Sequence, residues 1–309
     1  MDRNRPRGTR TAAASALALA ALAGCSDPGG GPPDGAPPPL GPVPAVRTSA
    51  DIPDLPLDAY LLTREQYQAF LLAQRTAVRR CMARYGFDYR ALDAVLTPGE
   101  VPDPRPDKAR YYFLVDDSAA RKAGYHPPPR VRARDKTTDG PDTTPTEAER
   151  AVLAGRDAGR SVGGATVPRG GCQGEAEHAL LGDGGRPDFL QVANERNQPR
   201  ARADADDRLA KAFAAWSACM KESGHDYRDP AQANDDPRWR GGTAGPAEIA
   251  TATADVACKR RTNLTGLWWA LQSAYEKQYI ERNAERMGAV RRTVDAVLRN
   301  SPALAGGGA

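Results

Sequence analysis

The sequence predicts a mostly α-helical protein, built from a duplicated helical module with two disulfides and preceded by a disordered tether. Apolar residues recur at three- and four-residue steps in several separate segments, which is the helical period. Several of these segments begin with a capping box or end at a glycine, which are start and stop signals of a helix. A single run, 111–115, has the composition of a strand, so we do not expect a sheet protein.

The start of the chain predicts export and lipid attachment. Four arginines within the first ten residues precede an apolar run, 12–23. That run is shorter than the roughly 20 residues a spanning helix needs, and the whole stretch follows the secretory pattern. It closes on Leu-Ala-Gly-Cys25, which resembles a bacterial lipobox. We expect a signal peptide over 1–24, a diacylglyceryl group on Cys25 that binds membrane lipid, and a lipid-anchored chain on the extracytoplasmic face of the cell membrane.

The lipidated cysteine and a disordered tether are expected over 25–57. This stretch contains the run PGGGPPDGAPPPLGPVP, whose composition offers little apolar surface to bury. Proline-rich linkers extend by about 3.1 Å per residue, so about thirty residues would reach on the order of 90 Å. Such a tether would lift a domain away from the membrane and into the cell wall.

The first helical module is expected over 58–190. Thr63 and Gln66 form a capping box ahead of an apolar stripe that predicts a helix over 64–85. Shorter helices, each followed by a glycine, are expected over 117–123, 145–154 and 173–181. Loops rich in glycine, proline and polar residues are expected at 97–143 and 155–171.

The second module is expected over 200–300. An apolar stripe predicts a helix over 205–223, and a further helix is expected to start at Pro246. From 264 to 298 the apolar spacing stays helical, which predicts one long amphipathic helix that Gly288 could bend. A disordered tail is expected over 301–309.

A ten-residue element occurs twice, as CMARYGFDYR over 81–90 and as CMKESGHDYR over 219–228. The cysteine, methionine, glycine, aspartate, tyrosine and arginine are identical, which indicates duplication. We expect Cys and Met to face the core, Gly to adopt the left-handed conformation, Asp to accept hydrogen bonds in the turn and Tyr to pack the exiting chain back. The alternative is that the Asp-Tyr pairs act as acid–base or ligand groups.

Four cysteines remain beside Cys25, namely Cys81, Cys172, Cys219 and Cys258. An extracytoplasmic location permits disulfides, and four cysteines allow three pairings. The repeat favours Cys81–Cys172 and Cys219–Cys258, one bond in each module. Zinc is the rival interpretation, but the sequence has no CxxC and no close Cys/His pair, so we expect no metal.

We find no motif of a named reaction in the sequence. HExxH, GxSxG, SxxK and P-loop patterns do not occur, and the three histidines, His126, His178 and His225, are far apart in the chain. The acid pairs at 116–117 and 235–236 fall in expected loops or caps and are only a weak glycosidase signal. We therefore expect no catalytic residue and no cofactor.

The adjacent Trp268 and Trp269 have two interpretations. Trp268 belongs to the apolar stripe, whereas Trp269 is turned away from it by one residue and could be exposed. The expected role is a core contact against other helices. The alternative is that the aromatic rings stack on a sugar or on a partner.

The charge of the chain argues against nucleic acid as a partner. The formal net charge is +4, but residues 1–24 carry four arginines and one aspartate, a net of +3. Their removal leaves a formal charge of +1, without the concentrated Lys and Arg that nucleic-acid binding needs.

The lipobox, the tether, the CMxxxGxDY element, Gly-Tyr-His-Pro-Pro at 124–128 and Ala-Asp-Val-Ala-Cys-Lys at 254–259 together resemble a group of uncharacterised actinobacterial lipoproteins. The resemblance extends over most of 60–300. It implies a lipoprotein with a helical, two-disulfide domain, and it implies no activity and no catalytic residue.

These observations predict a non-enzymatic cell-envelope lipoprotein that interacts with an envelope protein or with peptidoglycan. One alternative is a solute-binding lipoprotein of a transporter, although such proteins usually alternate strands and helices in two lobes. The other alternative is a cell-wall hydrolase.

Overall fold

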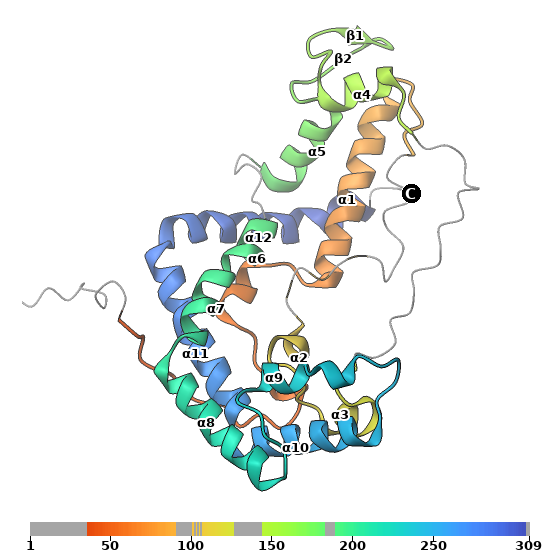
Figure 1. The fold of residues 1–309 in the computed structure, drawn as a ribbon. Helices are drawn as coiled ribbons and strands as arrows, with labels where there is room; N and C mark the ends of the chain where they lie inside the picture. The colour runs from red at the N-terminus through yellow and green to blue at the C-terminus, as the bar shows by residue number, and fades with distance from the viewer. Residues whose placement is uncertain are drawn as a thin grey trace, which may run out of the picture. The chain divides into compact units, whose positions relative to one another are not determined.

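The computed structural model describes residues 36–90, 101, 103, 105, 107–126, 144–182 and 189–306. Within these residues the mostly α-helical class predicted from the sequence is confirmed (Figure 1). The expected signal peptide and the lipidated Cys25 lie outside the described residues, as do the expected loop residues 127–143. Among the described helices, none combines the length and apolar character needed to cross a membrane.

The elements follow the chain in this order: η1 (Ser49–Asp51), η2 (Pro56–Tyr60), α1 (Arg64–Ala83), α2 (Lys108–Tyr111), α3 (Asp117–Ala123), α4 (Glu147–Ala154), β1 (Ser161–Val162), β2 (Ala165–Thr166), α5 (Gly171–Leu181), α6 (Phe189–Glu195), α7 (Asn197–Asp204), α8 (Asp207–Glu222), α9 (Pro230–Asn234), η5 (Pro237–Trp239), α10 (Pro246–Thr262), α11 (Leu264–Arg282) and α12 (Ala284–Gly306). The antiparallel pair β1–β2 lies in the expected glycine-rich loop and was not predicted. The run 111–115 forms no strand, since its first residue ends α2.

The predicted start at Arg64 and the predicted ends before Gly124, Gly155 and Gly182 are confirmed, whereas the helix predicted over 145–154 begins later, at Glu147 after its N-cap Thr146. The Thr63 hydroxyl accepts from the backbone N–H of Gln66 at 3.2 Å, and the Gln66 side chain accepts from the Thr63 N–H at 2.8 Å. Helix α3 covers the predicted 117–123, and α8 lies within the predicted 205–223.

The single long helix predicted over 264–298 is wrong, because the chain turns at Asn283 between α11 and α12. The Asn283 side chain donates to the Tyr279 carbonyl at 2.8 Å and so caps the end of α11. The break directs the apolar stripe of α12 onto α1 and α5, where Met287 and Val297 are fully buried. The expected disordered tail is also wrong up to residue 306, since α12 continues there and Ser301 is buried.

The predicted extent of the tether is wrong for residues 37–57, which we call the strap. Its apolar residues occur singly among prolines, yet Val46, Ile52 and Leu57 are all buried. The strap crosses the start of α11 at Gly266, where an added Cβ would lie 2.0 Å from the Pro44 carbonyl oxygen. A proline-rich composition therefore describes an extended segment that packs against the helices. Its few apolar side chains are buried in an apolar core that is formed mainly by other segments of the chain.

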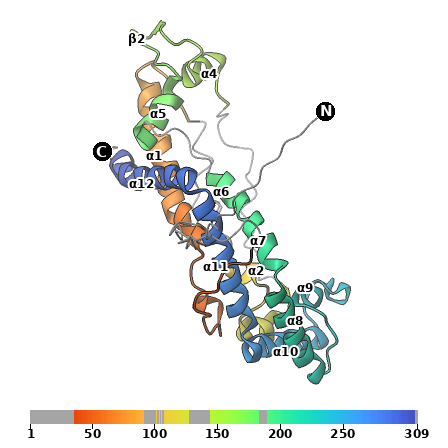
Figure 2. The same cartoon turned by 90° about the vertical axis from the view of Figure 1, so that its left-hand side faces the viewer.

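Among the described residues, three large apolar clusters and a small one between α3 and α10 replace the two modules expected over 58–190 and 200–300. One joins the strap to α8, α10 and α11, which lie together in both views (Figures 1 and 2). A second joins α1 and α12, and a third lies around the end of α1 and α5. Helix α3 packs on α10 and α12 packs on α1, so each predicted module takes a helix from the other half of the chain.

Both predicted disulfides are present, Cys81–Cys172 and Cys219–Cys258. Each joins the first residue of one copy of the repeated element, in the last turn of α1 or α8, to a later helix, α5 or α10. The two bonds close chain separations of 91 and 39 residues. They link the C-terminal turns of α1 and α8 to α5 and α10, which lie outside the repeated element.

The two copies share the same helix-ending geometry. Gly86 and Gly224 have φ values of +79° and +84°, which only glycine adopts at low cost. The residue after each glycine donates its N–H to the methionine carbonyl, at 3.2 Å in the first copy and 2.9 Å in the second. Both methionines and both tyrosines are buried, as predicted. The duplicated sequence therefore encodes a duplicated helix stop of the Schellman type.

Candidate functional site

A row of buried polar side chains follows one face of α10, and we call it the polar seam. Its members are three or four residues apart, so they share a helix face, and each is at most 3% exposed: Glu248, Thr251, Asp255 and Lys259. Buried charges need partners, because an unpaired one costs several kcal/mol. The partners of these side chains therefore decide whether the polar seam is available for chemistry or stabilises the fold.

The lower half of the polar seam is fully paired. The Asp255 carboxylate accepts from the Trp216 indole N–H at 2.9 Å and from the Lys259 ammonium at 3.0 Å. The ammonium also donates to the Leu114 carbonyl at 2.7 Å. Burial raises the pKa of Asp255 and lowers the pKa of Lys259. This pair joins α8, α10 and the segment before α3, and its partners leave it no free face.

The upper half of the polar seam is a clamp made by His126. Its Nδ1 lies 2.8 Å from the Glu248 carboxylate and its Nε2 lies 2.7 Å from the Gly241 carbonyl. The Gly241 carbonyl can only accept, so Nε2 donates to it, and with Glu248 ionised Nδ1 donates as well, which is the hydrogen-bonding pattern of an imidazolium. The Gly241 carbonyl and the Glu248 carboxylate raise the pKa of His126 accordingly. The clamp ties the turn after α3 to α10 and to the loop before it.

The other histidines do not join this clamp. The Nδ1 of His225 lies 3.2 Å from the Thr251 hydroxyl, further along α10, and His178 is exposed on α5. Two residues distant in the sequence, His126 and His225, therefore both contact α10. The sequence carried one signal for this contact, the polar residues of α10 at helical spacing, and it is too common to identify a site.

The acid pairs at 116–117 and 235–236 serve local structure. Asp116 accepts from the Ser49 N–H at 2.9 Å, and Asp117 pairs with Arg121 at 2.8 Å. Asp236 accepts from the Tyr227 hydroxyl at 2.7 Å, whereas Asp235 accepts from its neighbour Asn234. Each carboxylate thus fastens a cap or a turn.

The repeated aspartates point away from the core, which corrects the expectation that they accept hydrogen bonds within the turn. The side chains of Asp88 and Asp226 are 69% and 84% exposed. Asp88 pairs with Arg90, and Asp226 with Lys221. The tyrosine that follows each aspartate is buried, so the geometry does not form an Asp-Tyr site in either copy.

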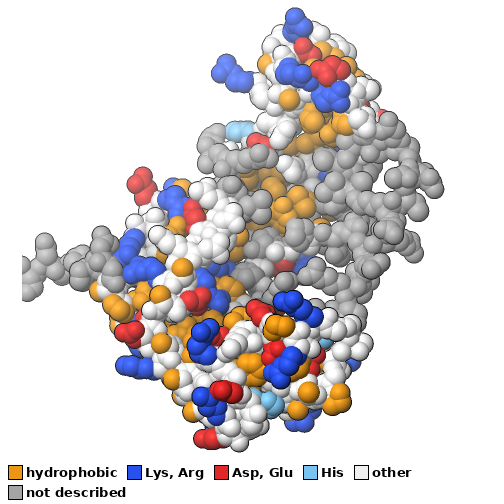
Figure 3. Space-filling view, in the orientation of Figure 1, with side chains coloured by type: hydrophobic (Ala, Val, Ile, Leu, Met, Phe, Trp, Pro, Cys, Tyr) orange, Lys and Arg blue, Asp and Glu red, His pale blue; other side chains and the backbone are white. Residues whose placement is uncertain are grey.

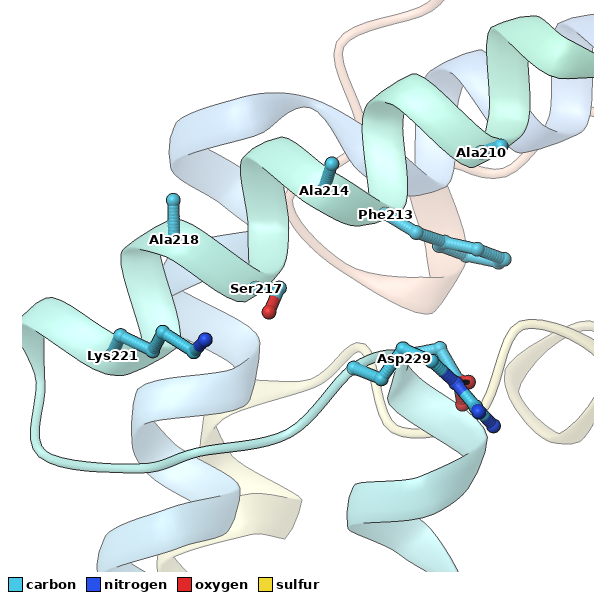
Figure 4. A pocket seen from close by; sticks show the side chains of 8 residues that line it. Ala210, Phe213, Ala214, Ser217, Ala218, Lys221 and Asp229 are labelled. Atoms are coloured by element: carbon cyan, nitrogen blue, oxygen red, sulfur yellow. Dashed lines mark hydrogen bonds and ion pairs between the residues drawn. The ribbon is translucent and has the colours of Figure 1, made fainter.

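A surface hollow of about 490 Å³ lies beside α8 in the second copy (Figure 4). Figure 4 shows Phe213, Ser217 and Lys221 reaching from α8 toward the turn that carries Asp229. The lining is mostly apolar and small, with charge at one end: Ala210, Phe213, Ala214, Ser217, Ala218, Lys221, Arg228 and Asp229. We call this the α8 hollow.

Two residues that line the α8 hollow are smaller than their counterparts in the first copy. The residue two positions before the cysteine is Arg79 in the first copy and Ser217 in the second. Both donate to the carbonyl of the conserved tyrosine, at 3.1 Å and 2.7 Å. Ser217 makes the same hydrogen bond to the tyrosine carbonyl with a much smaller side chain, which leaves space on the surface of α8. Similarly, Ala218 replaces Arg80.

A buried ionic triad lies outside both the polar seam and the α8 hollow. Arg196 pairs with Asp58 at 2.8 Å and with Glu276 at 3.0 Å, and the arginine and glutamate side chains are at most 4% exposed. Glu276 also accepts from the Leu57 backbone N–H at 2.8 Å. The triad therefore holds the strap onto α11, and nothing in the sequence pattern predicted it.

Within the described part of the chain, no group of three or more His, Cys, Asp or Glu side chains is placed to hold a metal ion. Comparisons of the chain with protein families, with curated proteins and with solved structures gave no match.

Proposed function

We propose that this chain is a non-enzymatic lipoprotein, held on the outer face of the cytoplasmic membrane by diacylglyceryl Cys25, that binds an envelope protein or peptidoglycan. Two disulfides within one chain support an extracytoplasmic location, because such bonds persist in oxidising compartments. The lipobox-like sequence at Cys25 supports the lipid anchor. Two acyl chains would hold the protein stably, whereas one alone binds membranes marginally.

The α8 hollow is the observation that carries the binding proposal. On this face Ser217 and Ala218 stand where the first copy has Arg79 and Arg80, while the hydrogen bond to the tyrosine carbonyl is present in both copies. Lys221 and Arg228 at one end are largely exposed and pair with Asp226 and Asp229, and such surface ion pairs are weak enough to exchange for an acidic group of a partner. On the face in Figure 3, positive and negative side chains are intermixed, which supports a partner other than nucleic acid.

Site-specific photo-crosslinking in cells tests this proposal. A photoreactive residue at the exposed Ala214 lies in the α8 hollow, and one at Thr76 occupies the equivalent position of α1. We expect the full-length protein to give a discrete crosslinked species from position 214 and none from position 76. Equal crosslinking from both positions, or none from either, would contradict the role of the hollow.

A further inference from the structure

The two adjacent tryptophans have separate surroundings. Trp268 is 4% exposed, and its indole N–H donates to Asp204 at 2.9 Å. Its ring packs against three other aromatic rings, which places it in the core. Trp269 is only partly buried, donates to the Pro53 carbonyl at 3.1 Å, and lines a second surface hollow. Of the two tryptophans, only Trp268 therefore makes the expected core contact.

The second hollow has a volume of about 460 Å³ and lies between the strap and α11. Pockets for small ligands commonly measure about 300–1,000 Å³. Trp269, Ser273 and Lys277 line it and are four residues apart, so they share one face of α11. The strap contributes Asp54 on the opposite side, and we call this space the Trp269 hollow.

The charges of the Trp269 hollow favour an anion. The exposed Lys277 forms no ion pair with any residue the structure describes. Asp54 receives the Lys108 ammonium at 2.7 Å and lies 3.6 Å from the Arg105 guanidinium. The remaining lining carboxylate, Asp58, is neutralised by the buried Arg196. The two lining cations, Arg105 and Lys277, thus lie beside two carboxylates that already have cationic partners.

We propose that the Trp269 hollow binds a saccharide that carries a carboxylate. The indole of Trp269 offers an apolar flat face for a sugar ring, while Lys277 and Arg105 offer charge-assisted hydrogen bonds to the carboxylate. Asp54 and the Ser273 hydroxyl offer acceptors for sugar hydroxyls. The proposal goes beyond the proposed function, because it adds a second site and gives the ligand of that site a chemical class, and it rests on the proposed function for the location of the ligand.

Isothermal titration of the full lipoprotein in detergent tests this inference. The probe is a wall-glycan disaccharide with a free lactyl carboxylate, and the matched neutral ligand is its methyl ester. We expect the acid to bind about tenfold more tightly than the ester, since a charged hydrogen bond contributes that much. Equal affinity for the two ligands, or no binding of either, would overturn the proposal.

Three variants locate the binding. Lys277→Ala should remove the preference for the acid, and Trp269→Leu should weaken binding of both ligands, whereas Trp269→Phe should restore most of it. Lys211→Ala, at an exposed lysine of α8 that lines neither hollow, is the matched control and should bind as the wild type does. Unchanged binding by the Lys277 and Trp269→Leu variants would contradict the site. If the disaccharide fails while position 214 still crosslinks a partner, this inference falls and the proposed function stands.

Discussion

Replacing both Cys219 and Cys258 with serine should lower the free energy of unfolding by about 4 kcal/mol. The bond closes a separation of 39 residues. The chain-entropy relation then gives the unfolded state about 13 cal/mol/K of extra entropy without the bond, or about 3.9 kcal/mol at 25 °C. Because both sulfurs are buried, the serine hydroxyls add a desolvation cost in the same direction.

The matched double variant of Cys81 and Cys172 tests the loop-length reasoning. Its separation of 91 residues predicts about 4.6 kcal/mol, slightly more than the shorter loop. Equilibrium urea unfolding, followed by far-ultraviolet circular dichroism, measures both losses. A loss below about 1 kcal/mol for either variant would refute the view that these bonds stabilise the two helix ends. The single Cys219→Ser variant adds a chemical check, since it should release one titratable thiol per chain after denaturation.

Three further predictions concern the helix stops and the polar seam. Gly86→Ala and Gly224→Ala should each lower the free energy of unfolding by about 1–2 kcal/mol, measured by thermal unfolding. The cost comes from backbone strain at positive φ, since no atom crowds the new methyl group. Stability equal to that of the wild type would contradict the left-handed assignment. The raised pKa of His126 predicts a stabilisation that is complete below about pH 6.5 and is lost as the pH rises through its folded value. Urea unfolding should show this slope in the wild type and lose it in His126→Gln, and an unchanged slope would exclude the clamp. Lys259→Met should cost about 3–5 kcal/mol by leaving Asp255 buried and unpaired, whereas adding Asp255→Asn should recover part of the loss; no recovery would argue against the pair.

Local signals predicted the helices and the disulfides well. A capping box or a glycine fixes a helix end through a few neighbouring atoms, so residues such as Thr63 and Gly224 determine their own surroundings. The repeat predicted the disulfide pairing, because each copy of the element was expected to bond to the next cysteine along the chain. Both kinds of information are present in short stretches of sequence.

Long-range packing was not predictable in the same way. The strap was assigned to a disordered tether because its composition is poor in apolar residues, yet Leu57 is buried by contacts with residues more than two hundred positions away. The turn at Asn283 interrupts a continuous helical period, which periodicity alone cannot detect. The α8 hollow involves Ser217, the counterpart of Arg79, and both residues lie just before the repeated element, where the two copies no longer match in sequence.

Intact mass spectrometry of the protein purified from membranes tests the central proposal most directly. A disulfide-linked lipoprotein predicts a chain that begins at Cys25, carries the mass of a diacylglyceryl group, and lacks four hydrogens because both disulfides are formed. Reduction should restore those four hydrogens and leave the lipid mass in place. A chain without the lipid mass would contradict the anchor. A chain that retains residues 1–24, carries no lipid and has five free thiols would contradict both the anchor and the extracytoplasmic location.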